Sequence, residues 1–182
     1  GQHLALRRLV EWTKAIQNNL PLSLDDAFID AFRTVLTDTS LDPALRELAL
    51  TLPSEMMIAE KMDEIDPAAI HQARQFMRKT LSEKLESEWQ AAYHDNRTEG
   101  DYRPTPQDAG RRALKNLALS YLLALGKTDY CQRAVDQYNH ADNMTDRLAA
   151  LTSLVHSGCL ARLPEAGELL TRFYREYENE PL

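Results

Sequence analysis

The sequence predicts an all-α fold, an irregular α-solenoid in which stacked helix pairs form an α-α superhelix. Apolar residues recur at intervals of three and four over most of the chain. Only 6 glycines and 8 prolines occur in 182 residues, and runs of β-branched residues are few, so signals for strands and hairpins are almost absent. No repeat of fixed length accompanies the alternation of helices and short turns, which makes the expected array irregular.

Three consecutive amphipathic helices are expected between Thr105 and Gly158, and the rest of the chain is organised around them. They begin near residues 106, 129 and 143, the first behind a hydroxyl cap at Thr105. Gly126 and Gly158 lie where two of these helices should stop, and each can take the left-handed conformation that follows a terminating helix. Their apolar stripes must pack on one another and on the flanking helices.

The segment from His140 to Asp146 contains the start of the third of these helices. Asn143 is expected to cap it, Asp146 to reach back from the third position, and Met144 to reach the core. A functional interpretation places Asp142 or Asn143 against a ligand, and the structural interpretation needs only the cap. These two residues are the candidate site residues of the chain.

Six further helices are expected, near residues 4, 24, 43, 54, 67 and 164. Asp42–Pro43 and Asp66–Pro67 each join an acidic cap to a proline at the first helical position. Ser23 is expected to cap the helix that begins near residue 24. The longest helix is expected to run without interruption from Pro67 to His94, about 40 Å at 1.5 Å per residue. The polar stretch Asp95–Arg103 should then form an exposed loop.

Two groups of side chains are expected to face inwards. In the short helix after Ser54 these are Met56, Ala59 and Met62, and in the final helix they include Phe173, Tyr174 and Tyr177. A last helix with such an apolar face lacks the polar outer surface of a terminal repeat. Together with a first residue that is Gly1 rather than methionine, and an end at Pro181–Leu182, this indicates a fragment of a longer chain.

Composition excludes several classes of function. A formal net charge of −7 argues against nucleic acid as a partner, and the basic cluster Arg111, Arg112 and Lys115 is expected to be a solvated helix face. No apolar run approaches the roughly 20 residues that cross a bilayer, so no membrane partner is expected. Cys131 and Cys159 are the only cysteines and are expected to be inert buried thiols, which fits a reducing cytoplasm.

Known catalytic and cofactor motifs are absent from the sequence. It contains no H-E-x-x-H, C-x-x-C, G-x-S-x-G or G-x-G-x-x-G, and none of its 5 histidines has another three to five residues away. We therefore assign no catalytic, cofactor-binding or metal-binding residue to this chain.

Several blocks of sequence resemble the C-terminal helical domain of bacterial aminopeptidase N. Their order and spacing match from about Leu20 to Tyr177. The blocks are Leu50–Glu55 (LTLPSE), Ile65–Ile70 (IDPAAI), Tyr102–Arg103 leading into Arg111–Asn116 (RRALKN), and His140–Asp146 (HADNMTD) followed by Leu148–Leu151 (LAAL).

The resemblance implies a parent enzyme, a zinc-dependent aminopeptidase that removes N-terminal residues from peptides in the cytoplasm. In that family an H-E-x-x-H helix and a downstream Glu hold zinc, and a G-x-M-E-N segment binds the amino terminus of the substrate. This chain has neither motif, so no catalytic or zinc-binding residue carries over to it, and the chain alone is expected to be inactive.

The resemblance also implies a place for the chain in that parent. Residues 1–182 would be a single helical domain, a fragment from the N-terminal part of the larger C-terminal domain. It would form wall of a substrate chamber and pack on the catalytic domain, with the remaining domains and peptide substrates as partners. The alternative is a free-standing α-solenoid adaptor that binds a peptide or protein in its concave face.

Overall fold

The computed structural model describes residues 2–98, 100 and 102–179. In these ranges every element of regular structure is a helix and none is a strand, which confirms the all-α prediction. Glu99 and Asp101 of the expected loop lie outside the described residues, as do Gly1 and Pro181–Leu182. The elements are α1 (Gln2–Gln17), α2 (Asp26–Thr37), α3 (Pro43–Leu50), α4 (Glu55–Ala59), α5 (Pro67–Lys84), α6 (Glu86–Asp95), α7 (Pro106–Leu123), α8 (Thr128–His140), α9 (Met144–His156), the 3₁₀ helix η1 (Cys159–Ala161) and α10 (Pro164–Tyr177).

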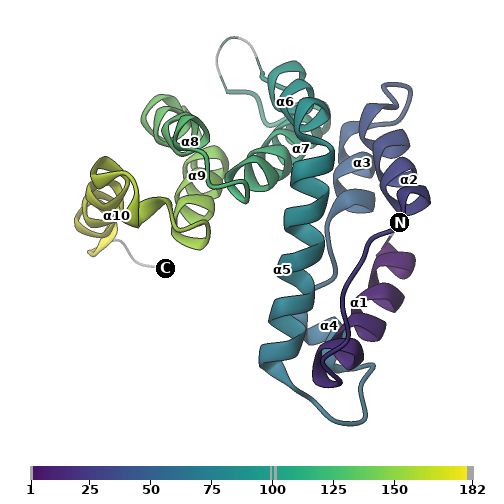
Figure 1. Ribbon diagram of the computed structural model, residues 1–182. Coiled ribbons are helices and arrows are strands. Elements are labelled where there is room, and N and C mark those ends of the chain that lie inside the picture. Colours follow the sequence, from purple (N-terminus) through teal and green to yellow (C-terminus); the bar gives the residue numbers. More distant parts are fainter. Residues whose placement is uncertain (1, 99, 101, 180–182) are drawn as a thin grey trace.

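Helix α7 lies in the middle of the array and packs on α3, α5, α6, α8 and α9 (Figure 1). Helices α1 to α5 lie on one side of it, and α8 to α10 extend away on the other (Figure 1). More than half of the residues of α7 are buried. Gly126 after α7 and Gly158 after α9 both have positive φ, 66° and 73°, as their expected role at helix ends requires.

Helices α3 and α7 approach each other closely at Gly110. A Cβ atom at this position would lie 3.0 Å from the backbone nitrogen of Ala44 and 3.2 Å from its Cβ. The absence of a side chain at Gly110 therefore lets the backbones of α3 and α7 pack directly on each other.

Replacing Gly110 by alanine should destabilise the fold, although alanine favours a helix. Overpacking against the backbone of α3 costs about 1–3 kcal/mol, which exceeds the gain of about 1 kcal/mol in helix propensity. Gly167→Ala in α10 is the matched control, because no atom of the described residues lies within 4 Å of a Cβ there, and it should stabilise α10. Urea unfolding of both variants measures the contrast, and equal stabilisation by the two would contradict the close approach.

Most helix starts follow the predicted caps. The carboxylate of Asp42 accepts from the Ala44 amide at 2.8 Å, and that of Asp66 accepts from the Ala69 amide at 3.0 Å. The Thr105 hydroxyl accepts from the Asp108 amide at 3.1 Å. These contacts involve neighbours two or three residues apart, so local sequence suffices to predict them.

The predicted cap at Ser23 is wrong. Asp25 caps α2 instead, and its carboxylate accepts from the Phe28 amide at 2.8 Å and from the Arg8 guanidinium at 2.7 Å. Asp25 directly precedes the first helical residue, and Arg8 of α1 gives its carboxylate a second partner.

The single long helix expected from Pro67 to His94 is also wrong. It divides at Leu85, whose φ of −124° and ψ of 27° separate α5 from α6, and the two helices run in different directions in Figure 1. Three fully buried side chains surround the break, namely Leu81, Leu85 and Trp89. The Trp89 indole donates to the Leu81 carbonyl oxygen at 3.3 Å, so a buried side chain supports the bend.

Several side chains expected to face inwards are exposed instead. Met56 is 70% exposed and Tyr174 is 68% exposed, while Met144 is 40% exposed. Ile58 fills the core position of α4, and Leu169 with Ala166 forms the buried face of α10. Ala59, Met62, Phe173 and Tyr177 are half-buried. The inner face of each of these short helices is therefore narrower than its apolar pattern suggests.

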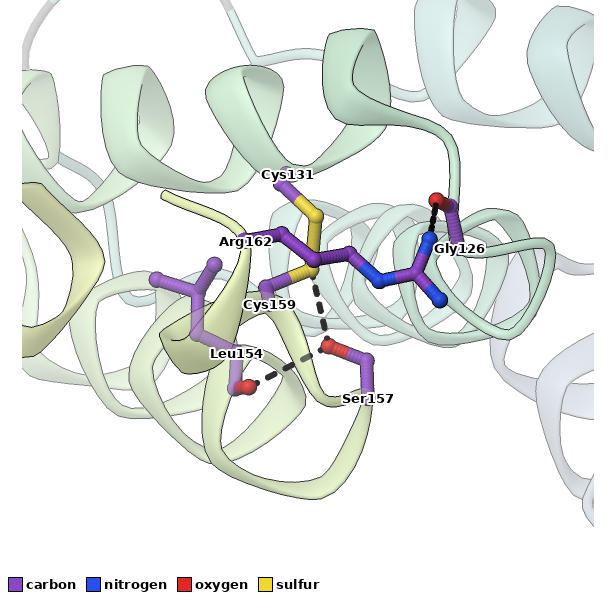
Figure 2. Close-up of a disulfide and its surroundings, with 6 residues drawn as sticks. All are labelled: Gly126, Cys131, Leu154, Ser157, Cys159 and Arg162. Atoms are coloured by element: carbon purple, nitrogen blue, oxygen red, sulfur yellow. Dashed lines mark hydrogen bonds between the residues drawn. A yellow bond between two sulfur atoms is a disulfide. The ribbon is translucent and has the colours of Figure 1, made fainter. Parts of the chain in front are cut away.

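The two cysteines are not thiols in this structure. Cys131 of α8 and Cys159 of η1 form a disulfide, with Cα atoms 5.7 Å apart (Figure 2). Their burial was predicted correctly, since both are fully buried, but the prediction of inert free thiols is wrong. Apolar neighbours around each cysteine do not reveal that two such environments meet in the fold.

None of the helices in the described part of the chain is long and apolar enough to cross a bilayer.

Candidate functional site

A polar cleft of about 780 Å³ opens where α6, α7, α8 and the start of α9 meet. The chain that follows α6 contributes Arg97, Thr98 and Gly100 to its wall. Side chains of both charges line the cleft, with histidines beside them. These residues are His94, Asp95, Arg97, Lys115, Arg133, Asp136, His140, Asp142 and Asp146.

A buried ion pair lies at one side of the cleft. The Lys115 ammonium of α7 donates to the Asp146 carboxylate of α9 at 2.6 Å, and the two side chains are only 8% and 6% exposed. The second carboxylate oxygen of Asp146 accepts from Asn116 Nδ2 at 2.8 Å. Both charges are thus removed from water and paired, which is the condition under which buried charges are tolerated.

Gln137 of α8 connects this pair to two further helices. Its side-chain amide lies 2.8 Å from Asn116 Oδ1 and 3.1 Å from the Asp146 carbonyl oxygen, to both of which it donates. Its own carbonyl accepts from the Tyr93 hydroxyl of α6 at 3.1 Å. Hydrogen bonds between side chains therefore fix four helices around the cleft, which limits how its wall can move.

Tyr93 acts in this network as a hydrogen-bond donor. Burial raises the pKa of its phenol, and the Arg133 guanidinium opposes this shift from 5.3 Å above the ring centroid. The phenol therefore stays protonated at neutral pH and keeps its bond to Gln137.

The two candidate residues predicted from the sequence, Asp142 and Asn143, differ in their exposure and in their contacts. Asp142 is exposed and lines the cleft, and its carboxylate accepts from Asn143 Nδ2 at 2.9 Å. Asn143 is half-buried and caps α9, because its side-chain oxygen accepts from the Asp146 amide at 2.9 Å. Its capping role is confirmed, whereas contact of either residue with a ligand stays a prediction.

Sequence reasoning missed the polar network itself. Arg112 and Lys115 were expected on a solvated helix face, yet both are buried. Arg112 donates to the Arg103 carbonyl oxygen at 3.3 Å and lies 4.8 Å from the Tyr102 ring centroid. A signal was available, because Lys115 and Asp146 lie in two of the blocks quoted above. The pairing could not be predicted because the two residues are 31 positions apart in the sequence.

The cleft does not fit a zinc ion. Zinc sites need at least three protein ligands from His, Cys, Asp or Glu, and the described residues contain no group of three that could hold a metal. What the cleft offers is hydrogen-bond donors and acceptors of both charges on a fixed frame.

Comparison with known families matches the whole chain, residues 1–182, to a family described as a domain of unknown function with ARM repeats, DUF3458_C. Aminopeptidase N of Escherichia coli K12 is 40% identical over 165 residues, which are 90% of this chain and 18% of that protein. Aminopeptidase N of Haemophilus influenzae is 35% identical over 167 residues, 91% of this chain and 18% of that protein. The chain thus spans less than a fifth of the length of these curated relatives.

A solved structure supports the same fold. The crystal structure of Legionella pneumophila aminopeptidase A in complex with aspartic acid matches 97% of this chain and 21% of that chain, with a TM-score of 0.80 and 24% identity. The resemblance found in the sequence is therefore confirmed. The chain belongs to the DUF3458_C family of ARM-repeat domains and is homologous to the C-terminal helical region of bacterial aminopeptidase N.

Proposed function

We propose that residues 1–182 form one helical domain segment of a longer zinc-dependent aminopeptidase, in which they contribute no catalytic group. The segment forms wall of the chamber that receives peptide substrates, and it packs on the catalytic domain. One observation carries the proposal. Aminopeptidase N of Escherichia coli K12 is 40% identical to this chain over 90% of the chain's length, yet the matched residues are only 18% of that protein.

The cleft supports a role as chamber wall. Its buried Lys115–Asp146 pair and Gln137 hold α7, α8 and α9 in one arrangement, so a substrate would meet a fixed surface. Asp142 is the exposed candidate residue at this surface. A rigid wall limits access by shape and removes peptide from bulk water, tasks for which no reactive group is needed.

Zinc belongs to other parts of the proposed parent. The described residues offer no ligand group for it, and the sequence has no H-E-x-x-H. The cytoplasmic location is also part of the proposal, and it depends on the resemblance alone, because the cysteines that first suggested it are paired.

Metal analysis combined with an aminopeptidase assay tests this proposal. The purified 182-residue chain should contain no stoichiometric zinc and should not hydrolyse an alanyl chromogenic substrate. The longer gene product should contain zinc and should hydrolyse that substrate. Zinc or activity in the short chain would contradict the proposal. A start codon immediately before the Gly1 codon and a stop codon after Leu182 in the encoding gene would instead favour the adaptor.

A further inference from the structure

The junction between α9 and α10 is held to α8 by the disulfide. Cys159 begins η1, directly after the left-handed Gly158, and Cys131 lies in the first turn of α8 (Figure 2). Both residues are fully buried. The Ser157 hydroxyl lies 3.0 Å from Cys159 Sγ and 3.2 Å from the Leu154 carbonyl oxygen. The disulfide thus closes a ring of chain that contains most of α8 and all of α9.

A second contact attaches the same junction to the turn before α8. The Arg162 guanidinium, just after η1, donates to the Gly126 carbonyl oxygen (Figure 2). A Cβ at residue 126 would lie 2.9 Å from Arg162 Nη1, so glycine makes room for this contact. Arg162 is exposed, and a contact of this kind alone stabilises little.

Helix α10 itself has few buried contacts. Only Ala166 and Leu169 of its residues are buried. Phe173 is half-buried and packs against the core. The polar attachments of α10 join the Arg172 guanidinium to Asn139 Oδ1 at 2.6 Å, and the Arg147 guanidinium to Glu176 at 3.1 Å and to the Tyr177 hydroxyl at 2.9 Å. Exposed pairs of this kind stabilise little. The position of α10 therefore depends strongly on the covalent link at its N-terminal side.

We propose that Cys131 and Cys159 form a redox-dependent clasp, which fixes α10 on α8 and α9 when oxidised and lets α10 undock when reduced. In the closing reaction two thiols lose two protons and two electrons and form one S–S bond. The oxidant is a small-molecule disulfide, which accepts those electrons and protons and leaves as two thiols. The reverse exchange, with a dithiol as reductant, opens the clasp.

Burial determines how the clasp opens. A thiolate must reach a sulfur atom in line with the S–S bond, and neither cysteine is exposed in the docked state. The reductant therefore acts on molecules in which the packing around the disulfide has opened locally and exposed a sulfur atom, while the bond still joins η1 to α8. Once the bond is reduced, the loop entropy that it removed from the open state returns, and the open state becomes more populated. This inference does not depend on the aminopeptidase assignment.

Thiol alkylation with mass spectrometry tests the bond itself. After exposure to oxidised glutathione, the intact 182-residue chain should take up no iodoacetamide, even when unfolded without reductant. After unfolding with reductant it should take up two equivalents. Alkylation of both cysteines in the oxidant-treated, unreduced chain would overturn the proposal.

Hydrogen exchange tests the consequence for α10. Reduction should speed exchange of the amides of residues 165–177 about tenfold and leave those of residues 68–84 unchanged, which also shows that the chain remains folded. The double variant Cys131→Ala/Cys159→Ala should exchange like the reduced chain and should not respond to reductant. Exchange in α10 that is the same in the oxidised and reduced chains would overturn the proposal.

Discussion

Replacing Asp146 by alanine should lower the free energy of unfolding by about 3–5 kcal/mol, because it leaves the Lys115 ammonium buried without its counter-charge. The same change removes the acceptor of Asn116 Nδ2. Urea denaturation followed by circular dichroism measures the loss. Asp142→Ala, four residues away on the exposed rim of the cleft, is the matched control and should change stability by less than about 0.5 kcal/mol.

A second variant separates the charge from the packing at this site. Lys115→Met combined with Asp146→Leu removes both charges together and should be more stable than Asp146→Ala, since no unpaired charge remains buried. If the double variant is as unstable as the single one, the loss comes from packing or from the Asn116 contact, and the ion pair is not its cause.

Replacing Trp89 by alanine should also cost about 3–5 kcal/mol. The indole is fully buried and stacks on the Tyr121 ring, with centroids 4.0 Å apart and an angle of 8° between the planes. Tyr121 in turn donates to the Leu50 carbonyl oxygen of α3 at 3.0 Å. Removal of the indole therefore leaves a cavity where α6 meets α7. Thermal unfolding by circular dichroism measures the loss.

Trp89→Phe is the control for the bend between α5 and α6. Phenylalanine keeps most of the stacked ring but cannot donate to the Leu81 carbonyl oxygen, so the expected loss is about 1–2 kcal/mol. Equal losses for Trp89→Ala and Trp89→Phe would show that the hydrogen bond at the bend, and not the stacked ring, accounts for the contribution of Trp89.

Helix starts could be predicted from the sequence because their causes are local. Asp42, Asp66, Thr105 and Asn143 each cap a helix through an amide two or three residues away. The cap of α2 was wrongly assigned to Ser23 for two reasons. Asp25 directly precedes the first helical residue, and Arg8 of the preceding helix binds the carboxylate of Asp25.

The bend at Leu85 could not be predicted from periodicity. Leu81, Leu85 and Trp89 keep helical spacing through it, and no proline or glycine marks it. A helix usually kinks at such residues or where a side chain bonds into its backbone ladder, and only the fold reveals that the Trp89 indole does so. The same holds for the disulfide, because nothing local distinguishes Cys131 and Cys159 from two buried thiols.

The candidate site was predicted only at its rim. The sequence predicts Asp142 and Asn143 as candidate residues because they belong to a polar cluster that precedes an apolar run. Lys115 and Gln137 are buried, Asn116 is half-buried, and all three come from other helices. Their partners lie 9 to 44 residues away. Patterns within one helix identify which face is apolar, but they do not show that a lysine on that face forms an ion pair with a carboxylate of another helix.

The direct contact of α3 with α7 at Gly110 bears on how such arrays change in evolution. Solenoid proteins with contacts only between adjacent units can gain or lose a unit by duplication or deletion. Here two helices whose facing residues lie more than 60 positions apart share one interface. Excising a unit that contains α3 would leave Gly110 without the surface that it fits, so this part of the array should be inherited as an indivisible block.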